Sequence, residues 1–132
     1  MEAKTSGNYS PPAVSPYIQF NEQSGTTYTL QLSDGGKTIL FTGSDNVCCV
    51  IPADDDVLFP TGTVVTVEQS GAGIVIIEPY DVTVTIDAYE DGRQSMGQYA
   101  YMQLVKKGAN HWTCIGGAEV TEVCGVTTTI AP

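Results

Sequence analysis

The amino-acid sequence predicts an all-β fold. Short runs rich in Val, Ile, Thr and Tyr recur along the chain, and clusters of Gly, Asp, Asn and Ser separate them. Such residues suit a pleated, half-buried surface, and a spacing near ten residues is typical of antiparallel sandwiches and barrels. No segment shows a sustained helical period. We therefore expect an antiparallel β-sandwich or barrel, jelly-roll or tulip-like in form.

The expected strands lie, in chain order, at residues 27–32, 37–41, 47–51, 63–68, 73–77, 82–86, 98–106 and 111–115. Alternation is clear in the first, where Tyr28, Leu30 and Leu32 share one face. It is equally clear in residues 98–106, where even-numbered and odd-numbered side chains face opposite ways. One face of each strand is expected to form the core.

Three segments organise the chain of 132 residues, a length typical of one domain. Residues 1–23 are expected to be an extended arm, residues 24–118 a β domain, and residues 119–132 a C-terminal strand or tail. Prolines in the first segment remove backbone donors and favour extended conformations. The arm is either a disordered tail or a segment ordered against a partner. Its candidate partner-binding residues are Tyr9, Val14, Tyr17, Ile18 and Phe20.

The charge and apolar content exclude two classes of partner. The formal net charge is −10, whereas nucleic-acid binding needs a basic surface that displaces phosphate counterions. No apolar run approaches the roughly 20 residues that span a bilayer. The N-terminus lacks the apolar core of a secretory signal, so we expect synthesis and retention in a cytoplasm. No nucleic acid and no membrane are expected as partners.

Catalytic and metal-binding patterns are missing from the sequence, so no enzyme activity, cofactor or metal is expected. The single histidine, His111, is three residues from Cys114, which on a strand places the two on opposite faces. The glycine-rich residues 70–73 precede no helix and so lack the anion-binding feature of phosphate loops. The acidic run 54–56 is expected to solvate an exposed turn. Residues 87–92 lack the spaced ligands of a calcium loop.

Four cysteines match no zinc pattern: Cys48, Cys49, Cys114 and Cys124. The side chains of adjacent residues on a strand point to opposite faces of the sheet, so those of Cys48 and Cys49 should face opposite ways. A cytoplasmic origin favours free, buried thiols. The alternative is a disulfide between Cys114 and one of the two neighbours.

A resemblance emerges from several short segments. It begins at residues 26–37 (TTYTLQLSDGGK), continues through 50–52 and 59–73 (FPTGTVVTVEQSGAG), and closes with 97–105 and 112–117. Over about residues 24–117 the order resembles a small β domain of tailed-bacteriophage virion proteins. The phrase FPxGTxxxxxQxGAG carries most of this resemblance. The paired cysteines at 48 and 49 depart from it.

The resemblance implies a non-enzymatic virion structural protein, assembled in the host cytoplasm and commonly trimeric. Two roles are open. A head decoration (cement) protein would bind the major capsid protein on the outer capsid surface as a homotrimer. With an arm of only about 25 residues and no shaft, this chain is expected to suit that role better.

The other role is a tail-fibre or receptor-binding tip that recognises a host surface glycan. Its flat stacking faces would come from aromatic side chains, although core packing is the expectation for at least half of them. The candidates are Tyr80, Tyr89, Tyr99, Tyr101 and Trp112.

Overall fold

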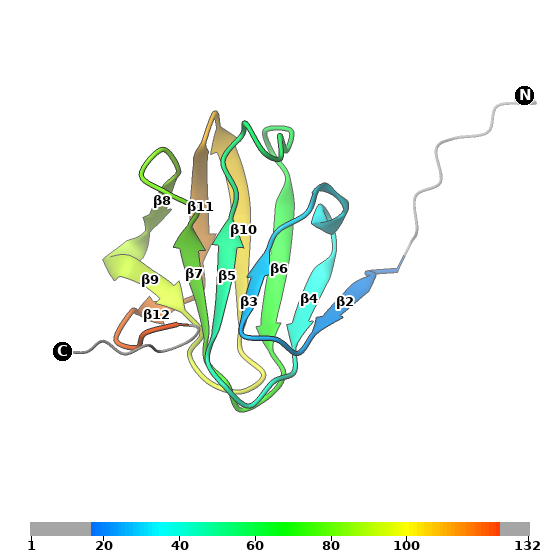
Figure 1. Cartoon of the computed structure of the whole chain (residues 1–132), viewed down its shortest axis with the longest axis vertical. Helices are drawn as coiled ribbons and strands as arrows, with labels where there is room; N and C mark the ends of the chain where they lie inside the picture. The colour runs from blue at the N-terminus through cyan, green and yellow to red at the C-terminus, as the bar shows by residue number, and fades with distance from the viewer. Residues whose placement is uncertain (1–16, 125–132) are drawn as a thin grey trace, which may run out of the picture.

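Two mixed β-sheets make up the fold in the computed structural model, which describes residues 17–124 (Figure 1). The six-stranded sheet has the order β2-β4-β6-β10-β11-β8, and the five-stranded sheet has the order β12-β9-β7-β5-β3. The described residues contain no α-helix, and none of their helical turns is long and apolar enough to cross a membrane. The predicted all-β class is confirmed.

The strands of the six-stranded sheet are β2 (Phe20–Gln23), β4 (Thr38–Phe41), β6 (Val64–Gln69), β10 (Tyr101–Gly108), β11 (His111–Ile115) and β8 (Thr85–Ala88). Those of the five-stranded sheet are β12 (Ala118–Glu119), β9 (Gly92–Gln94), β7 (Val75–Pro79), β5 (Val47–Ile51) and β3 (Thr27–Thr29). Two short 3-10 turns, η1 (Leu32–Asp34) and η2 (Tyr89–Asp91), connect strands.

Strand direction differs from the prediction. The pairs β2–β4, β4–β6, β3–β5, β5–β7 and β8–β11 are parallel, whereas β6–β10, β10–β11, β7–β9 and β9–β12 are antiparallel. The purely antiparallel arrangement expected from the sequence is therefore wrong. From β2 to β7 each strand lies in the sheet opposite to the strand before it. Two successive crossings bring the chain back to the same sheet, and along this stretch the returning strand runs parallel to its neighbour.

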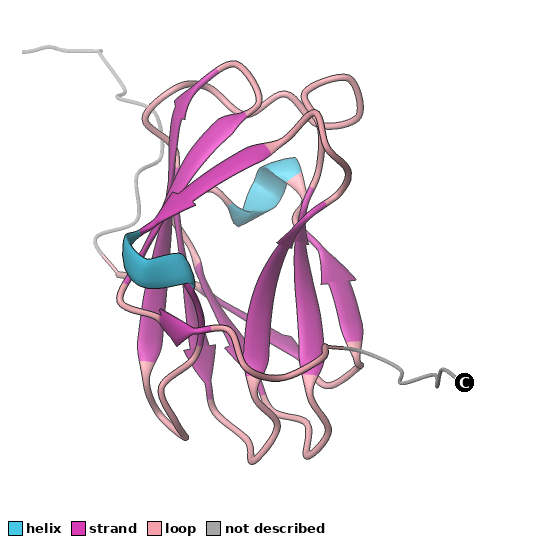
Figure 2. Ribbon diagram, turned by 90° about the vertical axis from the view of Figure 1, so that its left-hand side faces the viewer, coloured by secondary structure: helices cyan, strands magenta, loops and turns pink. Residues whose placement is uncertain are grey.

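The core lies between the two layers that Figure 2 shows edge-on. The six-stranded sheet contributes inward residues such as Ile39, Val65 and Leu104, and the five-stranded sheet contributes Val75 and Ile77, all fully buried. The alternation expected in residues 98–106 is confirmed from Tyr101 onward, since Met102, Leu104 and Lys106 are buried and Tyr101 and Gln103 are exposed. Residues 98–100 precede the strand, and Tyr99 there has a φ of 73°. The core also contains an edge-to-face pair, Phe59 and Trp112, with ring centroids 5.3 Å apart.

Several elements lie outside their expected positions. Residues 20–23, assigned to the arm by the sequence, form edge strand β2. The expected strand 82–86 begins only at Thr85, because the Asp81 carboxylate binds the backbone N–H and hydroxyl of Thr83 and closes a turn. Val82 consequently points into solvent. Leu32 lies in η1 with an exposed side chain, so it does not share a buried face with Leu30.

The glycine-rich loop 70–73 packs backbone against backbone on the loop after β4. The N–H groups of Ser70 and Gly71 both donate to the Phe41 carbonyl, and Gly73 N–H donates to the Gly43 carbonyl. A Cβ on Gly73 would overlap the Asp45 backbone, and one on Gly71 would overlap the carbonyls of residues 42 and 43. Glycine is thus required at positions 71 and 73, because the backbones of the two loops approach each other closely there.

Candidate partner-binding surface

One register row crosses the outer face of the six-stranded sheet. Paired positions on neighbouring strands project from the same face, and five of them line up from β2 to β11: Phe20, Thr38, Thr66, Gln103 and Ile115. Strands lie about 4.7–4.9 Å apart, so the row is roughly 19 Å long.

A groove of about 480 Å³ follows this row, which we call the sheet groove. Ile18, Tyr101 and Gly116 complete its lining. Threonine and glutamine side chains form its middle, and its ends are apolar. Ile18, Phe20, Tyr101 and Ile115 are each more than half exposed, at 64%, 59%, 56% and 52%. Four large apolar side chains gathered around one groove are typical of a surface that meets another molecule.

A buried carboxylate holds the β2 end of the groove in place. Asp34, 1% exposed, accepts hydrogen bonds from Asn21 Nδ2 (2.9 Å), the Tyr28 hydroxyl (2.7 Å) and the Gln31 N–H (2.8 Å). Asn21 thereby faces the body of the domain, and its neighbour Phe20 must face outward because strand side chains alternate. Burial, followed by the hydrogen bond to Asp34, raises the pKa of Tyr28 to about 12.

The predicted arm residues fall into two groups. Ile18 and Phe20 both line the sheet groove, and Tyr17 lies beside them with an exposed side chain. Tyr9 and Val14 lie outside the described residues. The sequence did not predict that Tyr101 lines the same groove as Phe20, and it gave no sign that Ile115 lines it too. Alternation in β10 signals that Tyr101 is outward, but only the strand order reveals that β2 and β11 belong to one sheet.

Asp54 differs from the acidic turn that the sequence predicts. Its Oδ1 lies 2.6 Å from the ammonium nitrogen of Lys106, which is 2% exposed and also donates to the Phe59 carbonyl at 2.9 Å. Asn110 binds both the Asp54 backbone and its Oδ2. Asp55 and Asp56 are exposed, as the turn interpretation expects. The first acid of the run is therefore structural, and only the other two are solvated.

A second hollow lies where β8 and β11 meet η2. Its volume is about 670 Å³, and its lining includes Asp87, Tyr89, Thr113 and Gly116. Asp87 Oδ2 lies 2.6 Å from Lys107 Nζ and 2.7 Å from His111 Nε2. Hydrogen bonds from Lys107 and then His111 hold the pKa of Asp87 below its usual value. The carboxylate is already paired at the rim of this hollow.

The expected separation of His111 from Cys114 is confirmed, since His111 is half-exposed and Cys114 is buried on the opposite face of β11. Burial raises the pKa of the Cys114 thiol to about 12, so it is not an activated nucleophile. Within residues 17–124, no group of three or more His, Cys, Asp or Glu side chains is arranged to hold a metal ion.

The cysteine pairing corrects the sequence expectation. Cys48 forms a disulfide with Cys124, and their Cα atoms are 4.9 Å apart. Cys49 and Cys114 are buried free thiols, as expected for all four. The alternative disulfide between Cys114 and Cys48 or Cys49 is wrong, because Cys48 is bonded to Cys124 and both Cys49 and Cys114 are free thiols.

The aromatic candidates divide unevenly between core and surface. Trp112 is 1% exposed and belongs to the core, whereas Tyr80, Tyr89, Tyr99 and Tyr101 are all exposed. The expectation that at least half of the five pack in the core is therefore wrong.

Comparison of the chain with protein-family models, with curated proteins and with solved structures finds no match.

Proposed function

We propose that this protein is a non-enzymatic structural protein of a phage virion, which binds the outer surface of the head as a decoration, or cement, protein. One observation carries the proposal: the sheet groove gathers four exposed apolar side chains beside the N-terminal segment. The resemblance of residues 24–117 to virion β domains supports it, as does the acidic surface, which resists non-specific association. The partner is the major capsid protein.

The energetics favour a binding role for this groove over a stabilising one. Fully burying an apolar side chain of this size gains about 1.5–3 kcal/mol, and the free protein leaves most of that gain unrealised at Ile18 and Phe20. Ordering an extended segment on a partner costs about 1–2 kcal/mol per residue in backbone entropy. We propose that burial of Tyr9, Val14, Tyr17, Ile18 and Phe20 offsets that entropy on the capsid.

We propose a homotrimer as the binding unit. Three linked copies turn the second and third contacts into intramolecular events, which raises overall avidity without new kinds of contact. Native mass spectrometry of the purified protein tests this part alone, and a monomer at micromolar concentration would refute the trimer.

Groove variants test the binding proposal. Ile18→Ser and Phe20→Ser remove apolar surface that is exposed in the free domain, so the fold should survive while affinity for particles lacking the protein falls at least tenfold. Leu58→Ser is the matched control, because Leu58 is 66% exposed and does not line the sheet groove. Unchanged binding by both groove variants would contradict the proposal.

A second candidate function is glycan recognition by a tail tip. It is favoured by Tyr89, which is 88% exposed at the rim of the second hollow and offers a flat stacking face. Labelled antibody on whole particles separates the two roles, because labelling of the shell supports decoration and labelling of the tail supports glycan recognition. If purified particles lack the protein, both roles fail.

A further inference from the structure

The outer face of the five-stranded sheet carries a register row of its own. Backbone pairing aligns one residue on each strand from β3 to β12: Thr27, Cys48, Ile76, Gln94 and Ala118. The middle of this row is closed over by the chain itself, whereas the corresponding row on the six-stranded sheet is an open groove. Residues 120–124, which we call the C-terminal strap, make the contacts.

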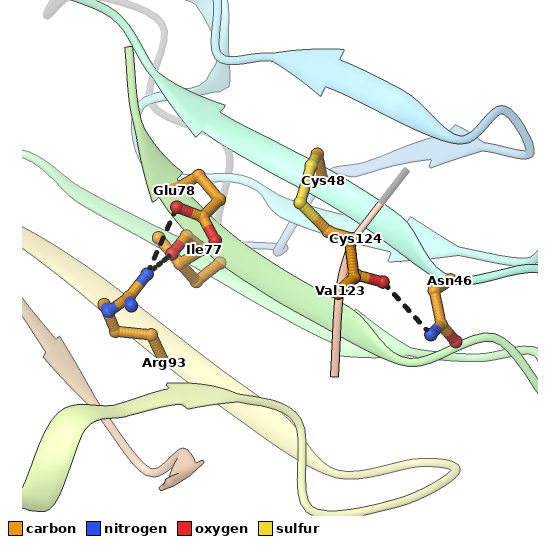
Figure 3. Close-up of a disulfide and its surroundings, with 7 residues drawn as sticks. All are labelled: Asn46, Cys48, Ile77, Glu78, Arg93, Val123 and Cys124. Atoms are coloured by element: carbon orange, nitrogen blue, oxygen red, sulfur yellow. Dashed lines mark hydrogen bonds and ion pairs between the residues drawn. A yellow bond between two sulfur atoms is a disulfide. The ribbon is translucent and has the colours of Figure 1, made fainter. Parts of the chain in front are cut away.

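Side chains of the row and of the adjoining loop hold the strap at several points. Gln94 Oε1 accepts hydrogen bonds from the N–H groups of Thr121 (2.9 Å) and Glu122 (3.0 Å). Asn46 Nδ2 donates to the Val123 carbonyl at 3.4 Å. Figure 3 shows the end of the strap, with the Val123 carbonyl oxygen directed toward the Asn46 side chain and the Cys124 sulfur bonded to Cys48. The last attachment alone is covalent.

The burial of the Ile76 side chain indicates what the strap covers. It is completely buried, yet its neighbours Val75 and Ile77 face the inter-sheet core and it does not. Ile76 lies in the row between Cys48 and Gln94, and both of these bind the strap, so the strap is placed to cover it. Loss of the strap would expose an apolar side chain in the centre of a sheet face.

We propose that the Cys48–Cys124 pair is a redox-controlled lock, which fastens the C-terminal strap over Ile76 under oxidising conditions and releases it under reducing conditions. The oxidant is a small-molecule disulfide of the glutathione class. One cysteine thiolate attacks it, forms a mixed disulfide and expels a thiol; the second thiolate then displaces the other thiol. The protein pair loses two electrons and two protons, and the small disulfide gains both.

The fold restricts this exchange to one pair of thiols. Cys48 and Cys124 are both partly exposed at the surface, where a small disulfide can reach them. Cys49, next in sequence to Cys48, is fully buried on the inner face, and burial raises the pKa of its thiol far above its usual value. Thiolate is the reactive form, so neither Cys49 nor the buried Cys114 competes for the lock.

The lock also implies when the strap closes. Only this timing rests on the proposed virion role. Reducing pools keep cytoplasmic thiols free, so the protein would assemble with an open strap. Release of particles from the cell would then expose the pair to an oxidising medium, and the strap would close.

Hydrogen exchange in defined glutathione buffers tests the lock in the wild-type chain. With oxidised glutathione, the Thr121 and Glu122 amides should be protected, and thiol reagent should find two free thiols only after denaturation. With reduced glutathione, exchange at these amides should accelerate by about tenfold or more, as expected for local opening. Two further thiols should then react in the native state.

Two variants sharpen this comparison. Cys124→Ser should exchange rapidly in both buffers, because it cannot close the lock. Val123→Ser is the matched control: the Val123 side chain is exposed and only its backbone carbonyl binds Asn46, so this variant should respond to redox as the wild type does. Equal protection of the wild-type strap in both buffers, or four free thiols in oxidised glutathione, would overturn the lock. Neither result would affect capsid binding through the sheet groove, so the two proposals fail separately.

Discussion

At the scale of single residues, the adjacent acids Asp54 and Asp55 are expected to behave very differently. Asp54→Ala leaves the buried Lys106 ammonium without its carboxylate, and removing one partner of a buried pair costs about 3–5 kcal/mol. Asp55→Ala, at an exposed position in the same turn, should change the free energy of unfolding by less than about 0.5 kcal/mol. Lys106→Met combined with Asp54→Ala should recover part of the loss. Denaturant titration measures all three, and equal stability of the two single variants would refute a structural role for Asp54.

A second residue-scale prediction concerns Tyr28 and pH. Its pKa is raised to about 12 from a usual value of 10.0, so folding favours the protonated phenol. The resulting stabilisation is fully present below pH 10 and is lost as pH rises through 12. Ultraviolet titration should show a tyrosine ionisation step near pH 12, and Tyr28→Phe should abolish that late step. Asp34→Asn should lower the pKa of Tyr28 toward its usual range. Absence of that late step from the wild-type titration would be the contrary result.

At the scale of elements, the glycine-rich loop gives a direct test of backbone approach. A methyl group at Gly73 overlaps the backbone of Asp45, so Gly73→Ala must displace one of the two loops and should destabilise the protein by about 1–3 kcal/mol. Gly97→Ala is the control, because nothing lies within contact of a Cβ there. Thermal unfolding of the two variants should differ clearly, and matching midpoints would argue against the close approach.

Most strands are predictable from the sequence, but their partners are not. Runs such as 47–51 and 111–115 are found at their expected positions, because β-branched and aromatic residues mark them. Alternation fails at Val82, where the Asp81 side chain closes a turn that periodicity alone does not reveal. The sequence does not reveal parallel pairing either, because a connection that crosses between the sheets and a hairpin loop within one sheet contain similar numbers of residues.

At the scale of the whole molecule, the disulfide joins residues separated by 76 positions. In the chain-entropy model a loop of this length contributes about 4.5 kcal/mol to the stability of the oxidised protein. Cys48→Ser with Cys124→Ser should therefore unfold at lower denaturant concentration than the oxidised wild type, and a reducing agent should remove the difference. A wild-type midpoint unchanged by the reducing agent would contradict this.

The candidate site also shows what only the assembled molecule reveals. Ile18 and Phe20 could be named as candidates for the groove from the sequence, because a solvated tail has no need of large apolar side chains, and both line it. Ile115 could not, since it lies nearly a hundred residues further along the chain and reaches the same groove only through the order of four intervening pairings. The opposite sheet repeats the same geometry with a strap in place. The two outer faces thus differ in one respect: the C-terminal strap covers the residue row of the five-stranded sheet, and the row of the six-stranded sheet is an open groove.

The most direct test of the proposed function is an image reconstruction of whole particles in which this chain is placed. The account predicts density on the outer surface of the head, with the sheet groove and residues 17–20 turned toward the shell. Density on the tail, or a groove facing solvent on the head, would contradict it.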